Sequence, residues 1–248
     1  MTGFLGAVQF LTRIPIRLHS DPGVARVVPW FPVVGALLGL LLGGVAAGLW
    51  ELVPPLVGAC VAVLAGVLVT GAFHEDGLAD TADGLGGDTP ERRREILKDS
   101  RHGSFGVAAL TGSILLRVAC VAGLPPAAAV GGLVATHTLA RAGSVGVMLV
   151  SSPAAPTGMG ADYISTVRRG PALVGLAAGL VIAAAATGWW AVPLAGAVVI
   201  AAGAMRWLVV RAYGAMGGDG LGAVEQVGEI MALVIVSGLA AEHTLWWA

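Results

Sequence analysis

The sequence predicts an all-α fold, a polytopic bundle of transmembrane helices, on three observations. Hydrophobic residues make up 56% of the 248-residue chain and charged residues only 12%, about half the usual charged fraction of a soluble domain. Apolar runs of about 20 residues, long enough to cross a bilayer, recur along the chain. The 38 glycines suit helices that pack closely in lipid. A soluble protein would need more polar surface.

We expect about seven spans and a short N-terminal segment. Residues 4–11 are amphipathic and too short to cross a bilayer, so this segment is expected to lie at the interface or to re-enter the membrane. The predicted spans are residues 27–50, 55–73, 104–124, 126–150, 171–187, 190–210 and 222–241.

One integral-membrane domain, residues 1–248, is expected, because no second region has the composition of a soluble domain. Its longest polar stretch, residues 74–103, reads as a cytoplasmic loop that carries the main motifs. Two cysteines inside apolar runs, Cys60 and Cys120, disfavour a disulfide framework and a zinc site. No cleavable signal peptide is evident.

The connections between the spans differ in charge. Residues 51–54, 125–126 and 188–190 contain no Lys or Arg, whereas the other connections are basic. Positive residues in short loops remain in the cytoplasm, and with seven spans all the basic connections fall on one side. We therefore expect a multi-pass protein of the cell inner membrane, with its N-terminus and active site facing the cytoplasm.

An acidic cluster follows the second predicted span. If the helix continues, Asp76, Asp80 and Asp83 lie at i, i+4 and i+7 on one stripe. Like charges on one stripe repel, so a cation is expected to compensate them. Mg²⁺ prefers carboxylate oxygens and commonly joins one or two of them to substrate phosphates. A solvated acidic loop is the alternative, but the shared face and the adjoining span favour a metal site.

The second polar element combines basic and small residues. The arginines at 92–94 are explained by the inside-positive rule or by contact with anionic lipid. The stretch after them contains the only lysine of the chain and leads into the start of the third span, where a helix N-terminus, hydroxyls and small residues form an anion cradle. Asp99 is a further candidate metal ligand. The candidate anion-binding residues are Lys98, Ser100, Arg101 and Gly103.

Ionisable residues also occur inside the predicted spans. Such residues are costly in hydrocarbon and usually pair with each other or line a cavity. Glu225 and Glu229 lie four residues apart near the inner end of the last span, and Arg141 lies on the cytoplasmic half of its helix, within reach of them. For Arg117 and His137 we expect structural ion pairs between helices.

Five stretches of the chain together resemble the signature blocks of one family. They are residues 10–15 (FLTRIP), 31–35 (FPVVG), 74–84 (HEDGLADTADG), 98–106 (KDSRHGSFG) and 218–223 (GDGLGA). The family is cobalamin synthase, the adenosylcobinamide-GDP ribazoletransferases, and the resemblance covers essentially the whole chain in the same order and spacing. Glu75, Ala215 and Gly217 depart from the family pattern.

The resemblance implies a Mg²⁺-dependent phosphotransferase of cobalamin biosynthesis. Such an enzyme joins α-ribazole, or its 5′-phosphate, to adenosylcobinamide-GDP, releases GMP and gives adenosylcobalamin or its phosphate. Phosphoryl transfer depends mostly on positioning and charge neutralisation, which suits carboxylates that hold a metal beside Arg and Lys. The expected partners are these small molecules and the lipid bilayer, without nucleic acid; a homo-oligomer remains open.

Roles follow for the candidate site residues. His74 is the expected general base, since a His of near-neutral pKa accepts a hydroxyl proton; capping of the helix end is its alternative role. Lys98 and Arg101 are expected to neutralise the diphosphate. The candidate metal ligands are Asp76, Asp80, Asp83 and Asp99. The candidate substrate-binding residues are Arg13, Ser100, Gly103, Asp219, Glu225 and Arg141.

Three other functions compete with this interpretation. A CDP-alcohol phosphotransferase needs an Ala-Arg pair shortly after its first Asp-Gly, but Leu78-Ala79-Asp80 follow Asp76-Gly77. A prenyltransferase would show a second Asp-rich loop. A transporter would carry its polar groups near the middle of the membrane, whereas the main cluster lies at the cytoplasmic rim.

Overall fold

The computed structural model describes residues 1–97, 99 and 101–248, and it confirms the all-α prediction. Among these residues the one β-type contact is the isolated bridge between Pro153 and Met216. The helices are α1 (Thr2–Leu11), α2 (Val24–Val27), η1 (Val28–Trp30), α3 (Phe31–Leu49), α4 (Pro55–Thr70), α5 (Phe73–Leu85), α6 (Pro90–Ile96), α7 (Ser104–Ala122), α8 (Pro126–Leu149), α9 (Met159–Thr166), α10 (Arg169–Thr187), η2 (Gly188–Trp190), α11 (Ala191–Tyr213) and α12 (Gly218–Glu242).

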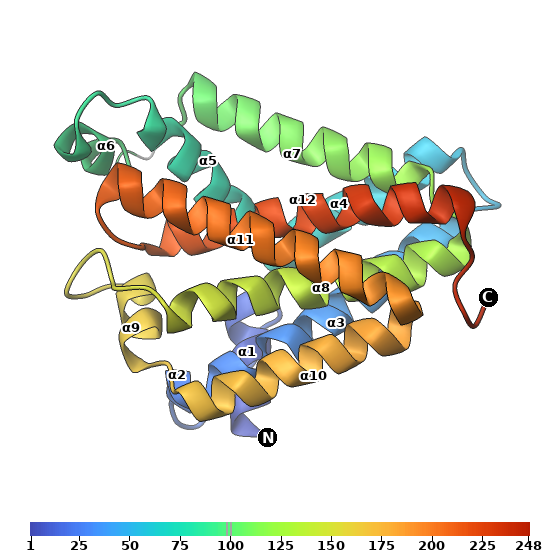
Figure 1. The fold of residues 1–248 in the computed structure, drawn as a ribbon, viewed down its shortest axis with the longest axis horizontal. Coiled ribbons are helices and arrows are strands. Elements are labelled where there is room, and N and C mark those ends of the chain that lie inside the picture. The colour runs from blue at the N-terminus through green and yellow to red at the C-terminus, as the bar shows by residue number, and fades with distance from the viewer. Residues whose placement is uncertain (98, 100) are drawn as a thin grey trace.

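The long helices lie side by side along one axis, and the short helices gather at one end of the bundle (Figure 1). Helices α2, α5, α6 and α9 lie at that end, and the C-terminus lies at the other. Helix α8 occupies the middle, where it packs against α3, α10, α11 and α12. The polar stretch and the acidic motif therefore lie at the same end of the molecule.

In the described part of the chain, four ranges are long and apolar enough to cross a membrane, and the bent pair α4–α5 is a fifth if it counts as one span. The predicted count of about seven spans is therefore not confirmed. One reason is that α8 is not among these ranges. It is 24 residues long but includes several buried polar side chains. The four ranges are Val24–Leu49, Ser104–Ala122, Arg169–Tyr213, which contains both α10 and α11, and Gly218–Glu242.

Apolar side chains cover the outside of the bundle. Large hydrophobic residues are exposed along the outer faces of α3, α4, α7, α10 and α11, among them Leu41, Leu68, Leu115, Val181 and Ile200. Buried polar and charged residues occur inside it instead. This distribution is the reverse of that in a soluble protein and fits a multi-pass membrane protein surrounded by lipid.

A row of glycines brings α3 against α8. Gly35, Gly39 and Gly43 recur every four residues, so they share one face of α3. A Cβ atom on Gly35 or Gly39 would collide with the backbone carbonyl of His137 or Leu133 in α8, and one on Gly43 would lie 2.7 Å from the Cα of Val130. Small residues at this spacing let membrane helices approach closely.

The chain bends sharply between α4 and α5. Gly71 has φ +70° and Ala72 has φ +58°, and the two helix axes differ by 89°. The acidic motif therefore does not continue the preceding span, as the sequence suggested, but lies on a separate helix that turns away from it. Left-handed backbone at a non-glycine residue such as Ala72 is uncommon.

Candidate functional site

A cavity of about 340 Å³ opens at the end of the bundle that holds the short helices. Its walls come from α1, α3, α5, α8, α9 and α12, together with the loop before α9. Its lining combines aromatic and apolar side chains with ionisable ones. The polar lining residues are His74, Asp76, Arg141, Ser144, Thr157, Asp219 and Glu225.

Two aspartates meet at this cavity because α5 and α12 cross closely. The Cα atom of Gly77 lies 3.2 Å from a Cβ built on Gly222, and a Cβ on Gly77 would lie 2.8 Å from the carbonyl oxygen of Asp219. Two glycines at the crossing therefore let α12 bring Asp219 beside α5. Both Asp76 and Asp219 line the cavity.

Negative charge is crowded around this crossing. Asp80 lies one turn beyond Asp76 on α5, which is not by itself one of the four candidate spans. Burial and the nearby carboxylates of Asp76 and Asp219 raise the pKa of Asp80 to about 6. Among the described residues, the basic group in contact with it is His102, whose Nδ1 lies 3.6 Å from an Asp80 oxygen. A bound cation would relieve this repulsion.

Asp83 connects α5 to the start of α7. Its carboxylate oxygens accept hydrogen bonds from the backbone N–H groups of Gly103 and Gly106, each 2.7 Å long. The helix N-terminus predicted to hold a substrate anion is thus already occupied by a carboxylate of the same chain. Each oxygen keeps a further lone pair, so a metal role for Asp83 stays a prediction.

Behind the cavity lies a buried network of charged side chains. Arg141 Nη1 lies 2.7 Å from Glu225 Oε1, although this contact lacks hydrogen-bond geometry. Glu225 Oε2 accepts a 3.1 Å hydrogen bond from Gln226 and lies 3.4 Å from Nδ1 of His74. The sequence placed Arg141 within reach of the glutamates, and this contact confirms it. Glu225, His74 and Arg141 thus hold one another at the cavity wall.

The same network continues between α5, α7, α8 and α12. Arg117 donates to Glu75 through Nη2 and to Glu229 through Nη1, each at 3.0 Å. The other oxygen of Glu229 lies 3.1 Å from Nδ1 of His137. These contacts confirm the interhelical ion pairs predicted for Arg117 and His137. Glu75, which departs from the family pattern, is a partner of Arg117.

The predicted aspartates do not gather around one point in the described part of the chain. Within it, one group of three His, Cys, Asp or Glu residues has ligand atoms that lie within 4.8 Å of one another: His137, Glu225 and Glu229. Arg141 and Arg117 already contact the carboxylates of this group. We therefore interpret it as part of the ion-pair network. Mg²⁺ needs only one or two carboxylates when a substrate supplies phosphate oxygens. Asp76 and Asp219, which both line the cavity, are enough for such a site.

The remaining predicted residues lie outside the cavity wall. Arg101 is exposed and donates two hydrogen bonds to Asp99, which lower the pKa of Asp99 to about 2. Arg13 is exposed on the connection after α1, and its backbone N–H donates to the carbonyl of Val69. The predicted residues Lys98 and Ser100 lie outside the described residues.

Sequence reasoning missed the aromatic residues that line the cavity. Their rings come from α1, α3, α5 and α9, so no local spacing relates them. The residues are Phe10, Phe31, Phe73 and Tyr163. Of these, only Phe10 and Phe31 lie in stretches that the family resemblance covers.

Fold and site together define a polytopic helical membrane protein with an acid-rich cavity at one end of its bundle. A family model described as cobalamin-5-phosphate synthase matches residues 3–237. The chain belongs to this family, as its signature blocks indicated.

Curated relatives support the same assignment. A protein of Azorhizobium caulinodans is 40% identical, and the match covers 96% of each chain. One from Bradyrhizobium diazoefficiens is 37% identical over 93% of this chain and 91% of the relative. One from Novosphingobium aromaticivorans is 36% identical over 96% and 98%. All three are named adenosylcobinamide-GDP ribazoletransferase. No solved structure shows significant similarity to this chain.

Proposed function

We propose that this chain is a Mg²⁺-dependent phosphotransferase, an adenosylcobinamide-GDP ribazoletransferase. It joins α-ribazole, or its 5′-phosphate, to adenosylcobinamide-GDP with release of GMP, and forms adenosylcobalamin or its phosphate. The observation that carries the proposal is the similarity to relatives of that name over 93% or more of the chain. An acid-rich cavity beside a membrane bundle supports it. Membership of this family disfavours the CDP-alcohol, prenyl-transfer and transport alternatives.

The donor set at the α5–α12 crossing fits Mg²⁺. Asp76 and Asp219 line the cavity, and Asp80 adds a third carboxylate one turn beyond Asp76 on α5. A hard divalent ion bound there would neutralise charge on the diphosphate and polarise its phosphorus. Asp83 and Asp99 are the remaining proposed metal ligands. Their oxygens already accept hydrogen bonds, those of Asp83 from backbone N–H groups and those of Asp99 from Arg101.

The proposed reaction is one displacement at phosphorus. A ribose hydroxyl oxygen of α-ribazole forms a bond to the phosphorus attached to cobinamide. The bond from that phosphorus to the bridging oxygen breaks, and GMP leaves with this oxygen. His74 lies at the cavity wall, held by Glu225, and is the proposed acceptor of the hydroxyl proton. Burial and the charge of Arg141 lower its pKa to about 3, so it is a weaker base than a free histidine. Arg141 at the cavity wall supplies positive charge to the phosphates. Lys98 and Arg101 keep their predicted role of neutralising the diphosphate.

The proposed setting is the cytoplasmic side of the cell inner membrane. The basic residues of α6 and of the ends of α2, α10 and α11 lie at the cavity end of the bundle, and positive residues favour the cytoplasm. The whole chain, residues 1–248, acts as one integral-membrane transferase domain.

An assay with the purified protein in liposomes tests the proposal. Adenosylcobinamide-GDP, α-ribazole and Mg²⁺ are supplied, and the corrinoid product and GMP are separated by chromatography. We expect equal amounts of both. A preparation that melts in one cooperative transition, yet forms neither, contradicts the assignment.

A further inference from the structure

The aromatic residues that line the cavity form a continuous cluster of rings. Phe10 stacks on Tyr163 with ring centroids 4.4 Å apart and on Phe31 at 5.4 Å. Phe73 meets Phe10 edge to face at 5.2 Å. All four rings line the same cavity, although α1, α3, α5 and α9 are distant in the sequence. Aromatic side chains in a cavity lining are suited to a flat, apolar heteroaromatic group.

The size of the cavity distinguishes between the two substrates. Its volume of about 340 Å³ lies at the small end of the range of about 300–1,000 Å³ for sites that enclose a drug-sized ligand. A nucleoside fits such a volume. The corrin ring, with its amide side chains and adenosyl group, is several times larger and does not fit.

The polarity of the cavity matches that of a nucleoside. The lining combines the aromatic cluster with Asp76, Asp219 and His74, and the His74 ring lies 5.1 Å from that of Phe73. A benzimidazole nucleoside has an apolar base at one end and ribose hydroxyls at the other. Guanine, the base of the leaving group, carries donors and acceptors around its edge, and these would be left unpaired against phenylalanine side chains.

We infer that this cavity is the α-ribazole subsite, with Phe10 and Tyr163 in the apolar lining that packs against the benzimidazole and the ribose directed towards Asp76 and Asp219. This inference rests on the proposed function and locates one of its two substrates. The corrinoid, which carries the reacting phosphorus, then stays outside the cavity and presents its diphosphate at the rim near Asp76.

Equilibrium dialysis and steady-state kinetics test the subsite together. Dialysis of wild-type protein against α-ribazole alone requires no turnover, and we expect saturable binding. Phe10→Leu and Tyr163→Leu should each weaken this binding and raise the KM for α-ribazole about tenfold, the loss of one aromatic contact. The KM for adenosylcobinamide-GDP should stay within about twofold.

Phe4→Leu is the matched control. Phe4 lies on α1 like Phe10 and is similarly half-buried, but it packs against Trp30 and does not line the cavity. It should leave both KM values unchanged. For variants that fold poorly, benzimidazole is added to wild-type protein instead, where it should compete with α-ribazole and not with the corrinoid.

Several results overturn the subsite. The first is that folded wild-type protein does not bind α-ribazole. The second is that the substitutions raise only the KM for the corrinoid. The third is that GMP, and not benzimidazole, competes with α-ribazole. If α-ribazole binds and Phe10→Leu weakens its binding while no product forms, the subsite stands and the proposed reaction fails. The two claims are therefore separable.

Discussion

Two arginines set the charge balance inside the bundle. Arg117 and Arg141 are almost completely buried, and they face the buried carboxylates of Glu75, Glu225 and Glu229. Charges without water are stable only when they are paired and hydrogen-bonded. Removal of one partner is costly because it leaves the other charge buried alone.

Glu229→Gln should therefore destabilise the protein strongly. Glu229 contacts both Arg117 and His137, so its neutralisation leaves Arg117 with one carboxylate partner. We expect a loss on the order of 3 kcal/mol, measured as a lower melting temperature in detergent. Glu242→Gln, at the exposed end of the same helix, is the control and should melt like wild type. Equal melting of the two variants contradicts a structural role for the network.

Asp80→Asn should abolish turnover and leave melting nearly unchanged. The substitution removes a carboxylate from the crowded crossing of α5 and α12, and with it a ligand of the proposed ion. Wild-type turnover should likewise stop when EDTA is added and return with Mg²⁺. Asp88→Asn, in the exposed connection after α5, should remain active. Full activity of Asp80→Asn excludes Asp80 from the metal site.

At the scale of elements, close backbone contact between α3 and α8 depends on the glycine row. Helix α8 carries His137 and Arg141 and so fixes part of the ion network. A side chain on the α3 face would push α8 away, and the effect would reach the cavity through Arg141. The packing of one helix pair is thus coupled to the site.

Gly39→Ala should destabilise the bundle by about 1–3 kcal/mol, the usual cost of overpacking. The added methyl group collides with the backbone of Leu133, which cannot move without the whole helix. Gly44→Ala, on the same helix with open space around its Cβ position, should be neutral or slightly stabilising. Melting temperatures of the two variants in one detergent provide the comparison. Equal melting temperatures would show that the α3–α8 contact tolerates a side chain.

Sequence reasoning reached the elements that follow from composition and charge. Apolar runs predicted helices, and the cost of charge in hydrocarbon predicted that Arg117 and His137 would pair. The bend at Gly71 and Ala72 was missed, because alanine carries no signal for left-handed backbone. The hydrogen bonds from Gly103 and Gly106 to Asp83 were also missed, since they depend on how α5 meets α7.

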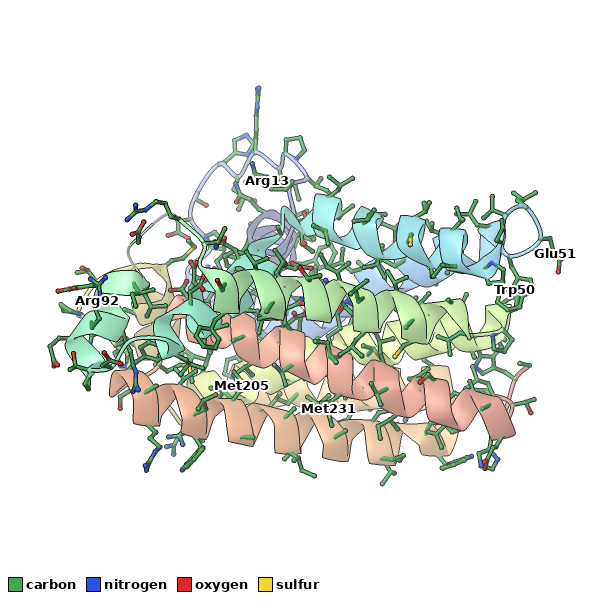
Figure 2. The ribbon with its side chains drawn as sticks, turned by 90° about the horizontal axis from the view of Figure 1, so that it is seen from above. Arg13, Trp50, Glu51, Arg92, Met205 and Met231 are labelled. Carbon is green, nitrogen blue, oxygen red and sulfur yellow. The ribbon has the colours of Figure 1, made fainter. Side chains whose placement is uncertain are left out.

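At the scale of the whole molecule, charge is unevenly distributed between the two ends. Arg92 lies at one end, whereas Trp50 and Glu51 lie at the other (Figure 2). Such a distribution orients a membrane protein. The cavity and its acids lie at the same end as the basic residues.

Accessibility of introduced cysteines tests this orientation. Glu91→Cys, at the basic end, should react with a membrane-impermeant maleimide only when the cytoplasmic face is open to the reagent. Glu51→Cys, at the opposite end, should react in intact spheroplasts. The unchanged chain, with Cys60 and Cys120, gives the background. Labelling of both positions from the same side contradicts the proposed topology.

The buried ion network also constrains the order in which the protein is made. Arg117 and Arg141 leave the ribosome well before α12, which supplies Glu225 and Glu229. Before α12 is made, Arg117 can pair with Glu75, while Arg141 has no other carboxylate among its described contacts. Synthesis of the last helix therefore completes charge compensation inside the membrane. A nascent chain that stops before Gly218 retains unmatched positive charge and should be a substrate for membrane proteases.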